Sequence, residues 1–290
     1  MLTELRLDIL PQPDDSTCGP TCLHAIYRYF GDSIDLDTVI RQTSFLEEGG
    51  TLAVLLGCHA LQRGYAAHIY TFNLNAFDPS WFQLNGAPAR QEILSSSAEA
   101  IPAGEPGAQP VRDDICGDEP YDNEYLIERL TAQMAVKSAK KLHRASKAYI
   151  EFLRRGGRLY MHDLTGELIR RYLVRDVPVL AGLSSTYLYW HAREYGPKCD
   201  SDDIRGLPAG HFVVLCGYDP FRQLVRIADP YLPNPLGEEH YYYVSLDRLV
   251  CAILLGVLTY DANLLVLMRR PPSDPGKGDG AEGPGTVSPP

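Results

Sequence analysis

The strongest constraint on the fold is that strand patterns collect in the C-terminal part of the chain, whereas helical patterns dominate before it. Short apolar or β-branched runs bounded by turn residues predict strands there. These runs lie at residues 178–184, 211–216, 224–229, 241–244 and 264–267, and one further strand is expected earlier, at 66–72. This separation favours an α+β domain in which an N-terminal helical part packs on a C-terminal antiparallel sheet.

Helical periodicity predicts the other elements. The expected helices lie at residues 17–30, 36–42, 51–63, 124–155, 164–175 and 245–255. Pro20 stands in the first turn of the first helix, where proline is tolerated, and Gly31 ends it. The helix at 124–155 is the longest and ends at Gly156-Gly157.

A chain of 290 residues can bury one large core, and we expect one domain over residues 1–270. Residues 95–123 are rich in Ala, Gly, Pro, Ser and acidic side chains without a period, which indicates an irregular insertion. Residues 271–290 predict a disordered tail.

Charge and hydropathy exclude several classes of partner. The net charge of -10 argues against a nucleic-acid-binding surface, and the basic residues from Lys137 to Arg158 are better explained as the solvated face of a helix. The apolar run 250–268 is interrupted by Asp261 and Asn263, so no membrane span is expected. The N-terminus does not resemble a signal peptide, and the seven scattered cysteines fit free thiols in a cytoplasmic protein. No glycine pattern for a nucleotide is present, and we expect no cofactor.

One cysteine stands where a nucleophile would be placed. Cys18 follows the turn-forming run Pro11 to Thr17 and opens the first predicted helix. Unpaired backbone N–H groups at a helix start favour a thiolate, but by only about 0.3–1 kcal/mol, so a reactive thiolate also needs a charged partner such as an imidazolium.

Strand geometry selects His211 as that partner. If strands 212–216 and 224–228 form a hairpin centred on Pro220, His211 lies directly across from Asp229, within reach of a hydrogen bond. A register slip of two residues keeps both on one face, whereas a slip of one separates them. Gln12, held between two prolines, can supply an oxyanion donor together with the backbone N–H of Cys18.

These residues resemble a known family in their order and spacing. Gln12 six residues before Cys18-Gly-Pro, then Gly210-His211-Phe-Val-Val-Leu-Cys-Gly-Tyr218 and Ile227-Ala-Asp229-Pro230, are similar to the C39-like branch of the papain-like cysteine peptidases. The resemblance covers about residues 8–75 and 175–268 and implies a papain-like fold. It further implies Cys18 as nucleophile, His211 as general acid and base, Asp229 as its orienting partner and Gln12 in the oxyanion hole.

The cysteines also allow a metal site or a purely structural role. Cys18 and Cys22 have the i, i+4 spacing of two metal ligands on a helix, but no second ligand pair is evident, and we expect no metal. Cys22, Cys58, Cys216 and Cys251 are expected to pack in the core, and the tyrosines around Tyr189 and Tyr242 to serve packing. His24, His59 and His68 are expected to be ordinary, partly exposed residues.

The hypothesis from the sequence is a cysteine peptidase or amidase that cleaves a peptide, isopeptide or related amide through an acyl-thioester on Cys18. The expected substrate is a peptide or amide, either free or within a protein. Two alternatives use the same fold. One is an acyltransferase or transpeptidase with the same site, and the other is a non-catalytic binding module with an unreactive Cys18.

Overall fold

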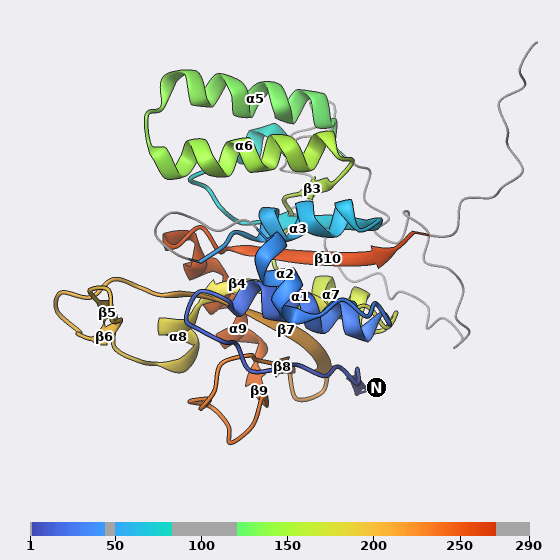
Figure 1. Ribbon diagram of the computed structural model, residues 1–290, viewed down its shortest axis with the longest axis vertical. Helices are drawn as coiled ribbons and strands as arrows, with labels where there is room; N and C mark the ends of the chain where they lie inside the picture. Colours follow the sequence, from blue (N-terminus) through green and yellow to red (C-terminus); the bar gives the residue numbers. More distant parts are fainter. Residues whose placement is uncertain (1, 44–49, 83–120, 271–290) are drawn as a thin grey trace, which may run out of the picture.

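The computed structural model describes residues 2–43, 50–82 and 121–270. Within these ranges the chain forms a layered α+β structure in which helices cover a central sheet (Figure 1). The helices are α1 Cys18–Tyr29, α2 Leu36–Gln42, α3 Ala53–Gln62, α5 Asn123–Val136, α6 Lys140–Arg154, α7 Gly166–Leu173, α8 Ser185–Tyr189 and α9 Leu246–Leu255, with 3-10 turns at Pro79–Phe82 and Gly256–Leu258.

The described residues form one eight-stranded sheet and a small two-stranded sheet. The large sheet has the order β3-β2-β10-β4-β7-β8-β9, and β1 pairs with β7. Its strands are β1 Thr3–Glu4, β2 Tyr65–Thr71, β3 Arg158–Tyr160, β4 Val179–Ser184, β7 Gly210–Asp219, β8 Leu224–Ala228, β9 Tyr241–Ser245 and β10 Asn263–Arg269, and the small sheet pairs β5 Glu194–Tyr195 with β6 Asp200–Ser201.

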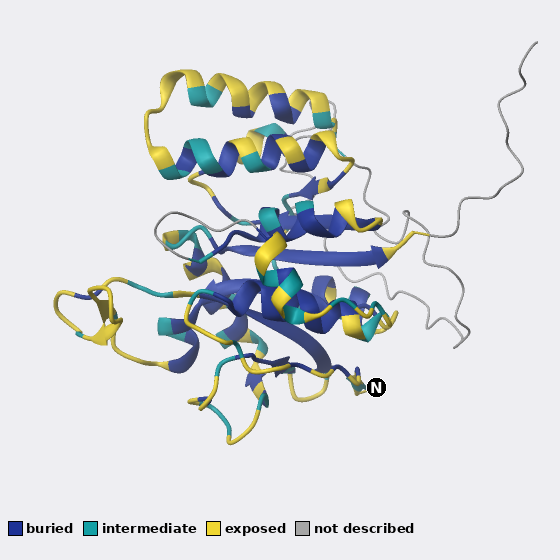
Figure 2. Ribbon diagram, viewed as in Figure 1, coloured by how far each residue is buried: buried dark blue, intermediate teal, exposed yellow. Residues whose placement is uncertain are grey.

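The sheet is mostly antiparallel, with one parallel pair between β2 and β3. It therefore extends beyond the C-terminal strands that the sequence predicted, because β2 inserts next to β10 and brings β3 with it. Central strands β4 and β10 are buried along almost their whole length (Figure 2), which is why they read as continuous apolar runs.

The long helix expected at 124–155 is instead two helices, α5 and α6, which pack on each other as a hairpin. Lys137 takes an extended conformation between them. The apolar stripe is interrupted at this point: Leu130 is the last buried side chain of α5, Val136 is exposed, Lys137 and Ser138 follow it, and the next buried side chain is Leu142. Separate helices let each half turn its own apolar face inward.

The insertion expected at 95–123 lies outside the described residues except for 121–123, and the tail expected at 271–290 lies outside them entirely.

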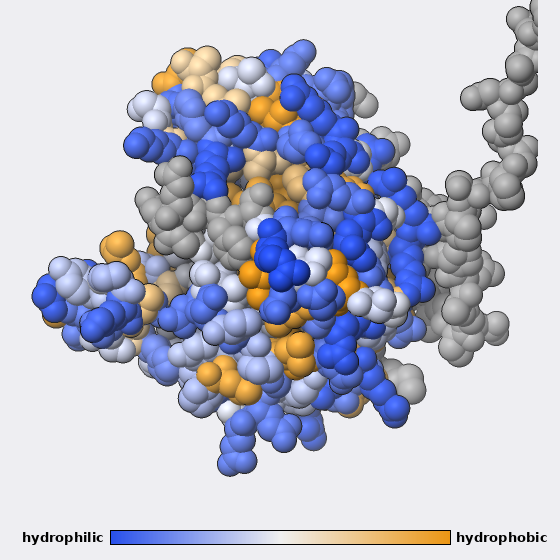
Figure 3. Space-filling model, viewed as in Figure 1, coloured by the Kyte–Doolittle hydropathy of each residue, from blue (hydrophilic) through white to orange (hydrophobic). Residues whose placement is uncertain are grey.

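Among the described residues, no helix combines the length and apolar character needed to cross a bilayer. Hydrophilic side chains predominate on the face drawn in Figure 3, with small hydrophobic groups between them.

Helix α1 packs against strand β7, and this contact positions the candidate site. Gly19 makes the close approach possible, because a Cβ atom there would lie 2.5 Å from Thr51 Cγ2 and 3.2 Å from a ring carbon of Phe212. Cys22, one turn later, donates from Sγ to the Phe212 carbonyl at 3.2 Å. The start of α1 is therefore held beside the start of β7.

Candidate active site

Cys18 is the first residue of α1, and a compact turn precedes it. The Asp14 carboxylate accepts hydrogen bonds from the backbone N–H of Ser16 at 2.8 Å and from its hydroxyl at 2.7 Å. The Thr17 hydroxyl donates to the Asp14 carbonyl at 3.0 Å. These bonds fix the direction in which the chain enters the helix, and Cys18 is buried with 7% of its surface exposed.

His211 lies on β7 and joins Cys18 to Asp229. Its Nε2 is 2.9 Å from Asp229 Oδ1, which leaves Nδ1 for the sulfur of Cys18. Burial disfavours the charged imidazole, but the Asp229 carboxylate and the Cys18 sulfur, by charge and by hydrogen bonds, together raise the pKa of His211 to about 10. The geometry therefore favours an imidazolium between a carboxylate and a sulfur.

The register of the hairpin differs by two residues from the prediction. Val214 pairs with Ala228, and a bulge between Leu215 and Gly217 shifts the ladder further. Asp229 is thus not directly opposite His211 and lies just beyond the end of β8. A shift of two preserves the face of the sheet, so the contact with His211 still forms.

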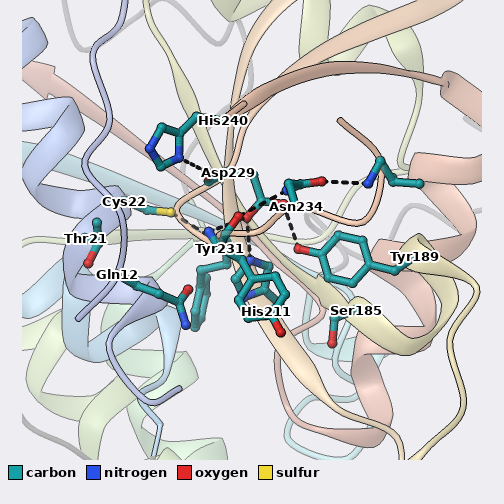
Figure 4. Close-up of polar contacts among 12 residues, drawn as sticks. Gln12, Thr21, Cys22, Ser185, Tyr189, His211, Asp229, Tyr231, Asn234 and His240 are labelled. Carbon is teal, nitrogen blue, oxygen red and sulfur yellow. Dashed lines mark hydrogen bonds and ion pairs between the residues drawn. The ribbon is translucent and has the colours of Figure 1, made fainter. Parts of the chain in front are cut away.

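Asp229 is fully buried and accepts several hydrogen bonds (Figure 4). Oδ1 also accepts from the backbone N–H of Tyr231 at 3.0 Å, and Oδ2 accepts from the phenols of Tyr189 at 2.7 Å and Tyr242 at 2.6 Å. Burial tends to raise the pKa of Asp229, but the charge of His211 and the hydrogen bonds from His211, Tyr242 and Tyr231 lower it to about 2. The carboxylate is ionised at neutral pH.

Gln12 lies next to this group through its backbone. Its N–H donates to the carbonyl of Pro230, the residue after Asp229, at 2.9 Å. Its side chain bonds to its own loop, where Nε2 donates to the Asp14 carbonyl at 2.9 Å. Its Oε1 is buried without a hydrogen-bond partner. The structure thus places Gln12 at the site with an amide that is not fully engaged.

Sequence reasoning missed the two tyrosines that contact Asp229. Tyr189 ends α8, a short helix that the sequence did not predict, and Tyr242 sits in a run of three tyrosines on β9. Their phenols bond a buried carboxylate, so packing is only part of their role. A useful signal would have been the pairing of β8 with β9, which brings Tyr241 opposite Ala228 and Tyr242 close to Asp229.

Several predictions about cysteine and histidine are corrected. Cys251 is exposed because it lies on the outer side of α9, and Cys58 is only partly buried. His24, His59 and His68 are buried rather than partly exposed. His59 has a structural role, with Nδ1 2.8 Å from the hydroxyl of Tyr27.

Among the described residues, no group of three or more His, Cys, Asp or Glu side chains is arranged to hold a metal ion.

The chain shows only distant likeness to known proteins. No family model matches it, and a search of curated proteins found no match. Among solved structures, the chain is similar to xylellain, a cysteine protease from Xylella fastidiosa. The two are 11% identical, with a TM-score of 0.38 over 93% of this chain and 86% of that chain.

Proposed function

We propose that this chain is a cysteine-dependent hydrolase of the papain-like class, of the C39-like branch, which cleaves a peptide, isopeptide or related amide. The observation that carries the proposal is the contact of His211 with both Cys18 and Asp229. A thiol at a helix start, an imidazole beside it and a buried carboxylate behind that imidazole form the constellation needed for thiol catalysis.

In the first half of the reaction, the thiolate of Cys18 attacks the carbonyl carbon, forming a C–S bond while the carbonyl electrons move to oxygen. The backbone N–H of Cys18 and the amide of Gln12 stabilise this oxyanion. When the tetrahedral intermediate collapses, the C–N bond breaks, and Nδ1 of His211 donates its proton to the leaving amine. The acyl group remains on Cys18 as a thioester.

In the second half, neutral His211 takes a proton from water as its oxygen attacks the thioester carbonyl. The C–S bond then breaks, releasing the carboxylic acid and the thiolate, and His211 is again an imidazolium. Asp229 keeps Nε2 of the ring protonated throughout, so that Nδ1 is the nitrogen that exchanges the proton.

The test is the rate of alkylation by iodoacetamide at mildly acidic pH, located by peptide mass spectrometry in the intact chain. Cys18 should be alkylated first. Cys199 is a suitable control because its residue is exposed. Partial desolvation of the thiol, together with nearby acidic groups such as Glu194, raises the pKa of Cys199, so it should react slowly. Equal slow rates at both cysteines would contradict the proposal.

Hydrolysis is then tested on a pool of peptide and isopeptide substrates with wild-type protein and with Cys18→Ala. Cleavage should require Cys18 and should persist in Cys251→Ala, which removes an exposed thiol on α9. Adding an excess of a primary amine separates hydrolysis from acyl transfer, because a transferase would yield the amide of that amine. A reactive Cys18 without cleavage of any member of the pool would contradict hydrolysis of this substrate class.

A further inference from the structure

The carboxylate of Asp229 has an unusual set of donors on the oxygen that does not face His211. Oδ2 accepts two phenolic hydrogen bonds, at 2.7 Å from Tyr189 and 2.6 Å from Tyr242. The phenols come from different elements, because Tyr189 ends α8 and Tyr242 belongs to β9. One oxygen of Asp229 is therefore hydrogen-bonded by side chains from two separate elements of the fold.

The four donors use the whole acceptor capacity of this carboxylate. Oδ1 takes His211 and the Tyr231 N–H, and Oδ2 takes the two phenols. An ionised carboxylate offers about four lone-pair sites. Because the carboxylate is fully buried, each lost donor would leave an acceptor that water does not reach.

Both phenols remain protonated donors in this setting. Burial, and then the charge of Asp229, raises the pKa of Tyr189 and of Tyr242 far above the ordinary value. A partial rotation of the carboxylate would weaken both phenolic bonds at once, so the arrangement holds one oxygen toward the imidazole and the other toward the phenols. The ring centroids of Tyr189 and Tyr231 lie 6.0 Å and 6.2 Å from that of His211, so both rings pack beside the imidazole.

We propose that Tyr189 and Tyr242 are positioning residues of the site, which hold the Asp229 carboxylate ionised and turned toward His211 so that the His211–Cys18 pair stays assembled at acidic pH. This inference rests on the proposed function. The tyrosines act through Asp229 and His211, and neither needs to touch the substrate.

The titratable groups that face Asp229 come from several elements. They are His211 on β7, Tyr189 on α8, Tyr242 on β9, Cys18 and Cys22 on α1, and His240, whose Nδ1 is 2.7 Å from the Asp229 carbonyl. The two phenols can be removed without changing a charge or a candidate reacting group. Tyrosine-to-phenylalanine substitutions therefore isolate the two hydrogen bonds.

The experiment compares Tyr189→Phe, Tyr242→Phe and the double variant in the full chain. Matched controls are Tyr187→Phe, on the same short helix, and Tyr243→Phe, the neighbour of Tyr242 on β9 whose phenol instead contacts Glu4. The Asp229 carboxyl is titrated by ¹³C NMR in a Cys18→Ala background, and circular dichroism checks folding. Each lost phenol should move the Asp229 midpoint upward by about one pH unit, with no shift in the controls.

The functional readout is the ratio of the Cys18 alkylation rates at pH 4 and pH 7. With the Asp229 midpoint moved from about 2 to about 4 in the double variant, half of the carboxyls are protonated at pH 4, so this ratio should fall by about twofold. A purely structural role would lower stability and leave the ratio unchanged. An unmoved Asp229 midpoint, or an unmoved ratio, overturns the inference. If the double variant does not fold, each single variant should still shift the midpoint, and their failure to do so overturns it equally.

The failure of this inference and that of the proposed function give different results. A Cys18 no faster than Cys199 in the wild-type protein rejects the proposed function, and the positioning role in catalysis with it, even when the ¹³C titration reveals the phenolic bonds. A fast Cys18 with an unchanged pH ratio in the double variant leaves the proposed function standing and rejects the role of the tyrosines.

Discussion

The two ends of the candidate site differ in how completely they are assembled. At one end, Asp229 accepts hydrogen bonds from His211, Tyr231, Tyr189 and Tyr242, and it is fully buried. At the other end, the Gln12 amide donates to the neighbouring Asp14 carbonyl, and its own oxygen has no hydrogen-bond partner. On the proposed mechanism, the end that would move protons is therefore preorganised, whereas the end that would bind the oxyanion is not.

This difference indicates where binding energy must be spent. The His211–Asp229 pair needs no rearrangement before a proton moves. To act as the proposed oxyanion donor, the Gln12 side chain would have to exchange its bond to Asp14 for one to the substrate oxygen, and catalytic hydrogen bonds often tighten in this way only in the complex. The backbone of Gln12 is already fixed by its bond to Pro230, so the rearrangement is confined to the side chain.

The largest expected effect comes from the preorganised end. His211→Ala removes the imidazolium beside Cys18, so alkylation at mildly acidic pH and amide cleavage should both fall by about a thousandfold or more. Stopped-flow alkylation and peptide cleavage measure the two rates. His191→Ala, at an exposed histidine whose ring is 5.9 Å from that of Tyr189, is the control and should retain both.

The next effect distinguishes the two ends directly. Alkylation by iodoacetamide forms no oxyanion, whereas amide cleavage does. Gln12→Ala should therefore lower kcat for cleavage by about 10²–10³-fold while leaving the alkylation rate and its pH dependence unchanged. A parallel loss of alkylation would mean that Gln12 supports the His211–Cys18 pair instead. The proposed division of the site into a proton-transfer end and an oxyanion end would then be wrong.

A smaller effect comes from a second buried aspartate, which lacks the donors of Asp229. Asp261 is 7% exposed, and burial raises its pKa to about 7, although a Thr259 hydrogen bond and the charges of Lys141 and His211 oppose the rise. Because its ordinary value is 3.8, the folded protein holds a proton here that the unfolded chain releases. Stability should therefore fall as pH rises from about 4 to about 7, by up to about 1.4 kcal/mol per pH unit.

Asp261→Asn removes this dependence. Urea unfolding of both proteins at pH 5 and pH 8 measures it, and the variant should gain stability relative to wild type at the higher pH. The titrations of His211 and Asp229 are common to both proteins and largely cancel in the difference. A wild-type-to-variant difference that is equal at the two pH values would show that Asp261 is ionised throughout, as Asp229 is.

Much of the secondary structure was predictable because it depends on local patterns. The prediction of α2 at Leu36–Gln42 is confirmed at both ends, and Ser245 caps α9 as predicted, with its side chain accepting from the Arg248 N–H. The prediction of a single helix at 124–155 was wrong because the apolar side chains before and after residues 137–141 stay in helical phase, so the gap in the stripe resembles one exposed turn of a continuous helix. Helix α8 was missed because five residues are too few for a periodic signal.

The proximity of His211 and Asp229 was predictable because side chains alternate between the two faces of a hairpin, so any even shift in register keeps both on one face. The register itself was not predictable. The bulge near Gly217 depends on how β7 meets β1 and β8, and no local pattern encodes it. The Tyr189 and Tyr242 contacts were not predictable, because each joins elements that only the complete sheet brings together. Whether Gln12, Cys18, His211 and Asp229 perform the roles proposed for them stays a prediction.

The backbone bond from Gln12 to Pro230 links the edge of the molecule to its centre. The segment before Gln12 is held by the pairing of β1 with β7 and by further hydrogen bonds, among them Leu5 N–H to the Cys216 carbonyl at 2.7 Å and the Tyr241 hydroxyl to the Leu7 carbonyl at 2.5 Å. Transient fraying of this segment would carry Gln12 away while the buried aspartate cluster stayed intact. Amide hydrogen exchange along residues 5–12 would then measure how often Gln12 is in place beside Asp229.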